Sequence, residues 1–160
     1  MKKYFLLLFL VVQLSFAQDK STTIYFIRHA EKVDSSNNPN LSTVGLERAA
    51  HWGEIFSEIP FDGIYSTDFT RTKETAKPTA TNKKINITLY DAKNIDFQKF
   101  KIDNLGKKVL VVGHSNTIPD FVNKLINQNL YPNIEDMTFG NLYIVTINGD
   151  IITHQLLKSL

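Results

Sequence analysis

Two short apolar runs in this chain each lead into a histidine. Residues 22–27 run into Arg28 and His29, and residues 109–112 run through a glycine into His114. Short β-branched runs of this kind, separated by helical patterns, indicate buried parallel strands. In an open α/β sheet, ligands bind outside the carboxyl ends of such strands. The sequence therefore predicts that both histidines face one crevice, where the neighbouring arginine favours an anion such as phosphate.

The first seventeen residues have the layout of a secretory signal peptide. Lys2 and Lys3 are followed by an apolar run over residues 4–14, and residues 15–17 (Ser-Phe-Ala) suit cleavage before Gln18. The apolar run is too short for a comfortable membrane span, although an uncleaved anchor helix is the alternative. We therefore expect an exported protein, periplasmic or secreted, with no stable membrane anchor after cleavage.

The composition excludes several classes of protein. The 160 residues include no cysteine, so neither a disulfide framework nor a thiolate zinc site is expected. Residues 1–17 hold two of the 18 basic residues and none of the 16 acidic ones, so residues 18–160 are formally neutral. Neutrality argues against nucleic-acid binding. We expect residues 18–160 to form one domain, because they are too few for two.

Strand and helix patterns alternate along residues 18–160. Strands are predicted at 22–27, 61–65, 85–90 and 109–112, and helices from Ser42 or Thr43 to before Pro60, over 69–79, over 95–105 and over 118–129. Pro78 falls near the end of the second helix, where it disturbs the backbone. Asn148-Gly149, between apolar runs at 142–147 and 151–156, predicts a tight hairpin. The order predicts an α/β three-layer sandwich with a mostly parallel central sheet, helices on both faces and a C-terminal hairpin.

Four residues, Arg28, His29, Arg71 and His114, suit phosphoryl transfer. A neutral imidazole nitrogen can attack phosphorus and form a phosphohistidine, which splits one hard displacement into two easier steps. The rigid fork of an arginine matches the phosphate oxygens over which charge spreads in the transition state. Arg28 adjoins His29, Arg71 lies early in a predicted helix, and His114 could add a donor if protonated.

Four blocks of the sequence resemble the histidine phosphatase superfamily, branch 1, also described as phosphoglycerate mutase-like. Residues 26–31 (Phe-Ile-Arg-His-Ala-Glu) resemble its Arg-His-Gly/Ala signature, and residues 111–116 match its Gly-His-Ser block. Residues 41–49 are similar to its Leu-Thr-x-x-Gly-x-x-Gln-Ala segment, and residues 65–76 to its Ser-Ser-Asp-Leu-x-Arg-Ala-x-x-Thr-Ala helix. The blocks stand in the family's order and cover most of residues 18–160.

The resemblance implies a phosphatase that hydrolyses phosphate monoesters, with His29 as the phosphorylated nucleophile. Arg28, Arg71 and His114 would form the phosphate pocket. The substrate would be a phosphorylated small molecule or a phosphoprotein. No metal or cofactor is implied, and the histidines of the chain show no metal-ligand spacing.

In many members of this family a carboxylate protonates the leaving oxygen. Asp91, after the third predicted strand, is one candidate, and Glu31 beside the nucleophile is its rival. Such an acid needs a raised pKa, and Asp91 as a plain turn residue is an equal alternative. Ser42, Thr43 and Asn37 are further candidates for contact with the substrate or its phosphate.

Three other functions stay open on the sequence. Residues 113–117 also resemble the nucleophile elbow of α/β-hydrolase esterases, and Ser115, Asp136 and His154 follow the order of that fold's triad; Thr117, however, replaces the second elbow glycine. A phosphate- or phosphoprotein-binding module without turnover would keep the same pocket. A mutase would need segments that close over the site and exclude water, and we find no insertion long enough for a substantial lid.

Overall fold

The computed structural model describes residues 21–159, so the predicted signal peptide lies outside the described residues. Export and the domain boundary at residue 18 therefore stay predictions. Within the described part, six strands form one sheet in the order β3-β2-β4-β1-β5-β6. They are β1 (Thr22–Arg28), β2 (Gly63–Ser66), β3 (Ile87–Leu89), β4 (Lys108–Gly113), β5 (Asn141–Asn148) and β6 (Ile151–Lys158).

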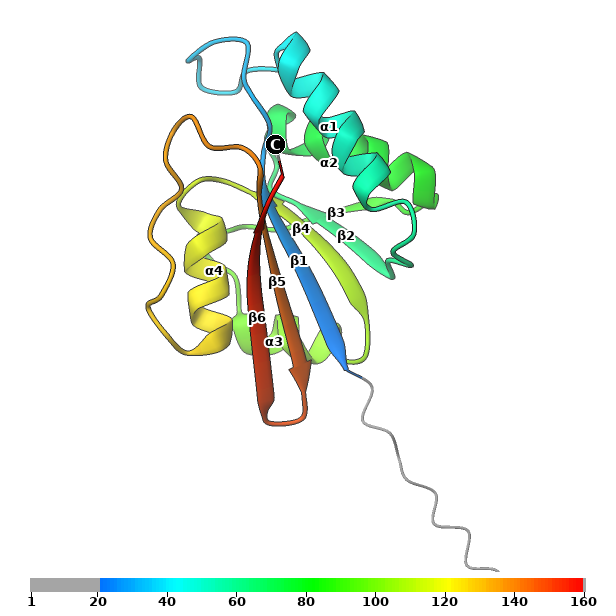
Figure 1. Cartoon of the computed structure of the whole chain (residues 1–160), viewed down its shortest axis with the longest axis vertical. Coiled ribbons are helices and arrows are strands. Elements are labelled where there is room, and N and C mark those ends of the chain that lie inside the picture. The colour runs from blue at the N-terminus through cyan, green and yellow to red at the C-terminus, as the bar shows by residue number, and fades with distance from the viewer. Residues whose placement is uncertain (1–20, 160) are drawn as a thin grey trace, which may run out of the picture.

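The sheet is mixed, as predicted. The strands β1, β2, β3 and β4 are mutually parallel where they pair, whereas β5 is antiparallel to β1 and β6 is antiparallel to β5. β5 and β6 form the expected hairpin at one edge of the sheet (Figure 1). Its turn holds Gly149 at a φ of 57°, a left-handed conformation that glycine adopts without steric cost.

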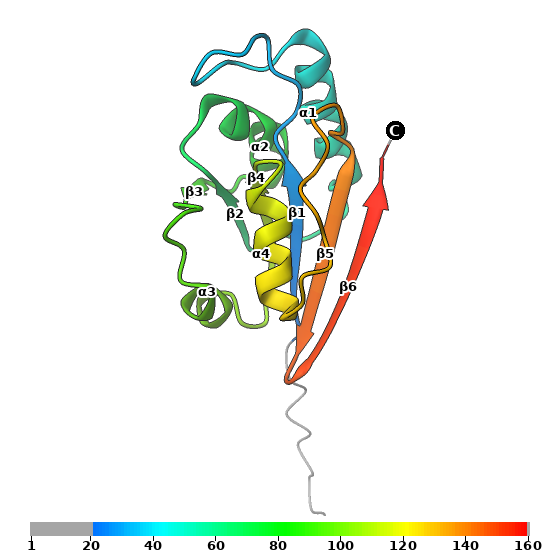
Figure 2. The ribbon, with the colours of Figure 1, turned by 90° about the vertical axis from the view of Figure 1, so that its left-hand side faces the viewer.

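Four helices cover the two faces of the sheet, which gives the predicted three layers (Figure 2). α1 (Thr43–Ile55) and α2 (Thr70–Lys83) pack on one face, and α3 (Phe97–Asp103) and α4 (Thr117–Ile126) on the other. Successive residues of β1 and β4 point to opposite faces of the sheet and pack against different helix layers. Phe26 and Val111 contact the α3 and α4 side, whereas Ile27 and Val112 contact the α1 and α2 side.

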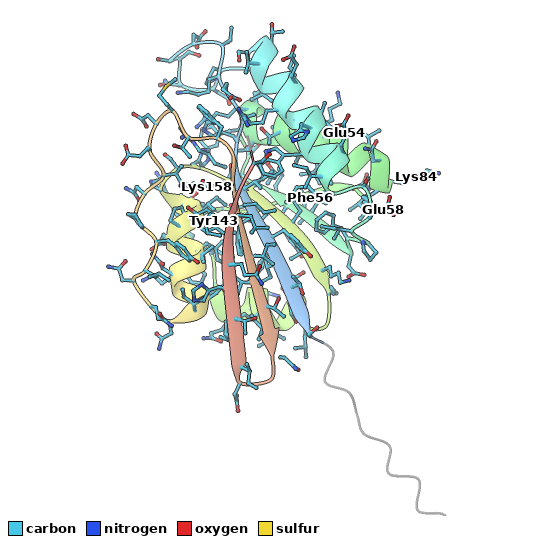
Figure 3. All side chains as sticks on the ribbon, in the orientation of Figure 1. Glu54, Phe56, Glu58, Lys84, Tyr143 and Lys158 are labelled. Carbon is cyan, nitrogen blue, oxygen red and sulfur yellow. The ribbon has the colours of Figure 1, made fainter. Side chains whose placement is uncertain are left out.

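Helix α2 extends beyond its predicted end. It continues through Pro78 to Lys83, and Lys84 ends it in the left-handed conformation at the outer end of the helix (Figure 3). Ala76 and Ala80 of this helix are buried against the sheet. A Cβ on Gly53 of α1 would lie 3.1 Å from the Pro78 side chain, which shows how closely the two helices approach. This burial outweighs the hydrogen bond that proline removes.

Helix α4 ends earlier than predicted, at Ile126. Asn127 takes a φ of 53° there, and the Asn123 side chain binds the chain beyond it. Its Oδ1 accepts from the N–H groups of Leu130 and Tyr131, and its Nδ2 donates to the Tyr131 carbonyl oxygen. These bonds satisfy backbone groups that a longer helix would have used. The chain then crosses, as a loop, to the start of β5.

No helix among residues 21–159 is both long enough and apolar enough to cross a membrane.

Candidate active site

The carboxyl ends of β2, β4 and β1 lie side by side, and each strand leads into a polar side chain. Arg28 pairs in register with Gly113, so the residues that follow, His29 and His114, leave the sheet together. Their ring centroids are 5.5 Å apart. The backbone N–H of His29 also donates to the Gly113 carbonyl oxygen at 2.9 Å. The structure thus brings together the two histidines that the strand pattern predicted at one edge.

His29 is a buried, neutral base. Its side chain is 4 % exposed, and burial lowers its pKa to about 3, with the charges of Arg28 and Arg71 acting in the same direction. Its Nδ1 lies 2.8 Å from the carbonyl oxygen of Ala30. A carbonyl only accepts, so the one proton of the neutral ring sits on Nδ1. Nε2 therefore keeps its lone pair, as a nucleophile requires.

His114 is also neutral, but both of its ring nitrogens are engaged. Nδ1 lies 3.4 Å from Nη2 of Arg71, and Nε2 lies 3.0 Å from Oγ1 of Thr67. A guanidinium only donates, so Nδ1 accepts and Nε2 carries the proton. Burial first, and then the charge of Arg71, lowers the pKa of His114 to about 4. In this arrangement the neutral His114 accepts from Arg71 and donates to Thr67, and its place in the phosphate pocket stays a prediction.

Arg28 anchors a distant loop. Its Nη1 donates to the carbonyl oxygens of Glu135, Asp136 and Thr138 at 2.9, 3.0 and 3.0 Å, and its guanidinium carbon lies 4.3 Å from the centroid of the Phe139 ring. The side chain is 5 % exposed. Sequence reasoning did not find this role, because the partners are backbone carbonyls, which no residue type marks.

Arg71, in the first turn of α2, lies between two parts of the site. Its Nη2 faces His114, its Nη1 donates to the carbonyl oxygen of Asn37 at 3.4 Å, and its guanidinium carbon lies 4.4 Å from the Phe69 ring centroid. Asn37 thus meets Arg71 through its backbone. The side chain of the next residue, Asn38, accepts from the N–H of Thr70 at 2.8 Å.

The Nε atoms of Arg28 and Arg71 are both buried and have no hydrogen-bond partner among residues 21–159. A buried donor without an acceptor is costly. Both guanidinium groups lower the pKa of His29 through their charge. A phosphate oxygen is an acceptor of the kind that such a donor takes.

The two predicted proton donors are engaged in other contacts. The Glu31 carboxylate binds Arg48, whose Nε lies 2.8 and 3.0 Å from its two oxygens. Asp91 is exposed, and its oxygens accept from the N–H of Lys93 at 2.9 Å and from Nδ2 of Asn94 at 2.7 Å. These bonds hold the pKa of Asp91 below its usual value, the opposite of what an acid needs. The geometry therefore favours the turn interpretation of Asp91, and the acid role of either residue stays a prediction.

Ser42 begins α1. Its Oγ accepts from the N–H of Gly45 at 3.1 Å, as the N-cap of a helix does. A Cβ on Gly45 would lie 2.2 Å from the carbonyl oxygen of Glu31, so this end of α1 packs directly on the chain that follows the nucleophile. The predicted contact of Ser42, or of Thr43 in the first turn, with substrate stays untested, whereas the capping bond is observed.

The triad of the esterase alternative is not assembled in the described residues. No hydrogen bond joins the side chains of Ser115, Asp136 and His154 there, and Nδ1 of His154 pairs instead with the hydroxyl of Tyr131 at 2.8 Å. Nor does any group of three or more histidine or acidic residues between positions 21 and 159 lie close enough to hold a metal ion.

A cavity of about 680 Å³ opens beside Arg71 and His114. Its walls come from the start of α2, the segment after β3 and the start of α4. The lining residues include Asp68, Phe69, Leu89, Tyr90, Asp91 and Lys93.

Comparison with known proteins gives a family match and shared folds. Residues 24–101 match the histidine phosphatase superfamily (branch 1). No curated protein matches the chain.

Solved structures share the fold at low sequence identity. Bacillus stearothermophilus YhfR superposes with a TM-score of 0.69 at 15% identity, over 87% of this chain and 98% of that one. Phosphoglycerate mutase from Bacillus anthracis str. Sterne gives 0.67 at 16% identity, over 88% and 94%. The alpha-ribazole phosphatase from Shigella flexneri gives 0.66 at 14% identity, over 86% and 96%.

Proposed function

The chain belongs to the histidine phosphatase superfamily, branch 1, and from this premise we propose that it hydrolyses phosphate monoesters through a phosphohistidine at His29. The observation that carries the proposal is the state of His29. Its Nδ1 proton is held by the Ala30 carbonyl, its Nε2 keeps its lone pair, and the charges of Arg28 and Arg71 act on the ring.

The reaction begins with attack of His29 Nε2 on phosphorus. The P–N bond forms as the P–O bond to the ester group breaks, and the electron pair of that bond leaves with the ester oxygen. The ring becomes positively charged, and the Ala30 carbonyl that already accepts from Nδ1 stabilises this charge. Arg28 and Arg71 bind the phosphate oxygens, on which charge is spread in the transition state. Water then attacks phosphorus, the P–N bond breaks with its electron pair returning to Nε2, and inorganic phosphate leaves.

Hydrolysis is favoured over mutase chemistry by the open rim of the cavity. A mutase must exclude water from its phosphoenzyme. Here Phe69 and Leu89, which border the cavity, are 37 % and 52 % exposed. The substrate class we propose is a phosphorylated small molecule or a phosphoprotein, and no cofactor is required by the steps above.

The first test is phosphate release from p-nitrophenyl phosphate by the wild type and two histidine variants. His29→Ala is expected to lower kcat/KM by about 10⁴-fold or more, because removal of a nucleophile abolishes covalent catalysis. His51→Ala, on the exposed face of α1, is the matched control and is expected to retain activity. Equal activity of His29→Ala and wild type would exclude the proposed nucleophile.

Two further outcomes separate the alternatives. Ser115→Ala is expected to keep most phosphatase activity, whereas an esterase that uses Ser115 would lose its activity. A wild-type protein that binds inorganic phosphate but releases none from any monoester would be the binding module without turnover.

A further inference from the structure

The cavity beside the phosphate pocket has an apolar wall. Phe69 and Leu89 present exposed apolar side chains to it. Tyr90 also borders the cavity, but its hydroxyl donates inward to the Val112 carbonyl oxygen at 3.4 Å. The Tyr90 hydroxyl is thus hydrogen-bonded within the protein, so Tyr90 offers the cavity its aromatic ring.

This apolar wall begins at the residues that hold the phosphate. The Phe69 ring centroid lies 5.0 Å from that of His114, and the Arg71 guanidinium carbon lies 4.4 Å from the Phe69 ring centroid. A group bonded to a phosphate held by Arg71 would therefore meet the Phe69 ring first. Aromatic rings pack well on such a wall, either stacked or edge-to-face.

Among the described residues that line the cavity, no carboxylate is free of other hydrogen bonds to protonate a leaving group. Its carboxylates are Asp68 and Asp91. Asp68 accepts from Nζ of Lys73 at 2.7 Å, and both oxygens of Asp91 accept hydrogen bonds from Lys93 and Asn94. The one proton of His114 is donated to Thr67. The hydrogen bonds from Asn94 and Lys93 lower the pKa of Asp91 and so stabilise its ionised form.

A leaving group that receives no proton must depart as an anion. A phenol, with a pKa near 10, does this far more readily than an alkyl alcohol, whose pKa is close to the value of about 15.7 for water. The apolar wall and the engagement of both carboxylates in other hydrogen bonds thus favour the same chemistry.

We propose that this site acts on phosphate esters of aromatic alcohols, with the aryl group bound against Phe69 and Leu89 and released as a phenolate without a proton from the protein. The inference rests on the proposed function and specifies its substrate class. In the step, the P–N bond to His29 forms, the P–O bond breaks with its electron pair on the phenolate oxygen, and the phenolate takes a proton from solvent after it leaves the cavity.

The main test is kcat/KM for a series of substituted phenyl phosphates and alkyl phosphates. Because kcat/KM reports steps through phosphorylation of the enzyme, slow hydrolysis of the phosphoenzyme does not hide the effect. We expect kcat/KM to rise steeply as the leaving group becomes more acidic. Alkyl phosphates should be slower than phenyl phosphate by about 10²- to 10⁴-fold, the usual contribution of general acid catalysis. Equal values for phenyl and alkyl esters would overturn the proposal.

Acetyl phosphate separates leaving-group acidity from aromatic binding, because its leaving group is acidic and not aromatic. Its kcat/KM is expected to lie below the line that the aryl series defines. A value on that line would contradict the proposal that the apolar wall binds the leaving group. A comparison of kcat/KM for phenyl phosphate and for a phosphotyrosyl peptide distinguishes a small-molecule substrate from a protein substrate.

Leu89→Ala tests the wall, with Leu105→Ala as its matched control at the opposite end of the sheet, where Leu105 is 71 % exposed. Leu89→Ala is expected to raise KM for phenyl phosphate about 3- to 10-fold, as expected for the loss of one apolar contact, with no change in KM for acetyl phosphate. Leu105→Ala should leave KM unchanged for both phenyl phosphate and acetyl phosphate. An equal rise for both substrates in Leu89→Ala would contradict the proposed contact.

Asp91→Asn tests whether Asp91 supplies a proton to the leaving group. We expect the dependence on leaving-group acidity to be the same as in the wild type. A selective loss of about 10²-fold or more on alkyl phosphates would identify Asp91 as the acid and overturn the inference. Failure of the proposed function looks different, because then no ester of either kind would phosphorylate His29.

Discussion

At the scale of single residues, the site depends on two imidazoles that stay neutral among positive charges. Burial is the first cause of the low pKa values of His29 and His114, and the arginines add to it. Neutrality makes Nε2 of His29 a nucleophile, and it lets Nδ1 of His114 accept from Arg71. A protonated ring could do neither of these.

The ring titrations of the free protein test this point. Between about pH 8 and pH 5, where an ordinary histidine with a pKa near 6.5 takes up its proton, His29 and His114 are expected to show no titration. The measurement is the ring ¹H and ¹⁵N shifts across that range, with assignment by His29→Asn and His114→Asn. Titration of either ring near pH 6.5 would contradict the neutral pocket.

The same low pKa values have a consequence for stability. As pH falls below about 6.5 the unfolded chain takes up protons at these two positions, whereas the folded chain does so only near pH 3 to 4. Both neutral rings therefore contribute fully to the free energy of unfolding above pH 6.5. This contribution is lost as the pH falls towards the pKa values of the two histidines in the folded state.

Arg28 shows where sequence reasoning at this scale ends. Its place beside His29, and the crevice both share with His114, follow from the strand pattern. Its hold on the carbonyl oxygens of Glu135, Asp136 and Thr138 does not, because those partners lie more than a hundred positions away and any residue type offers the same acceptor.

At the scale of elements, the helices fix the chain that follows His29. The N–H of Ala30 donates to Oγ1 of Thr75 at 3.0 Å, and the N–H of Leu41 donates to the Glu74 carboxylate at 2.7 Å, so α2 holds both ends of the loop after β1. α1 reaches the same segment where Gly45 packs on Glu31.

Ser42→Ala is predicted to destabilise the protein without changing catalysis. Loss of the N-cap bond to Gly45 should lower the free energy of unfolding by about 0.5–2 kcal/mol, measured by urea denaturation. Ser42→Asp retains an acceptor and should restore most of the stability. Ser57→Ala, at an exposed position after α1, is the control. A fall in kcat/KM with unchanged stability would instead assign Ser42 to substrate binding.

Pro78 marks the limit of sequence prediction at this scale. A proline near the end of a helical pattern suggests a boundary, yet α2 continues because Ala80, beyond it, is buried against the sheet. The stabilisation from this burial depends on the position of the sheet and of Gly53 on α1. Neither is visible in a local window of sequence.

At the scale of the whole molecule, the strand order makes the site. The pattern of strands and helices predicted a mostly parallel sheet with a closing hairpin, which the structure confirms. That order places β4 between β2 and β1, so residues 29, 67 and 114 meet although they are far apart in the chain. The cavity could not be predicted, since its walls come from three separate segments.

The most direct measurement is the identity of the phosphorylated atom. Wild-type protein is mixed with p-nitrophenyl phosphate, quenched without acid, digested and analysed by mass spectrometry, and the intact phosphoenzyme is examined by ³¹P NMR. The account predicts phosphate on His29, at Nε2, because Nδ1 carries the proton that the Ala30 carbonyl holds. Phosphate at Nδ1 of His29, on His114, or on no histidine while the substrate is turned over would contradict it.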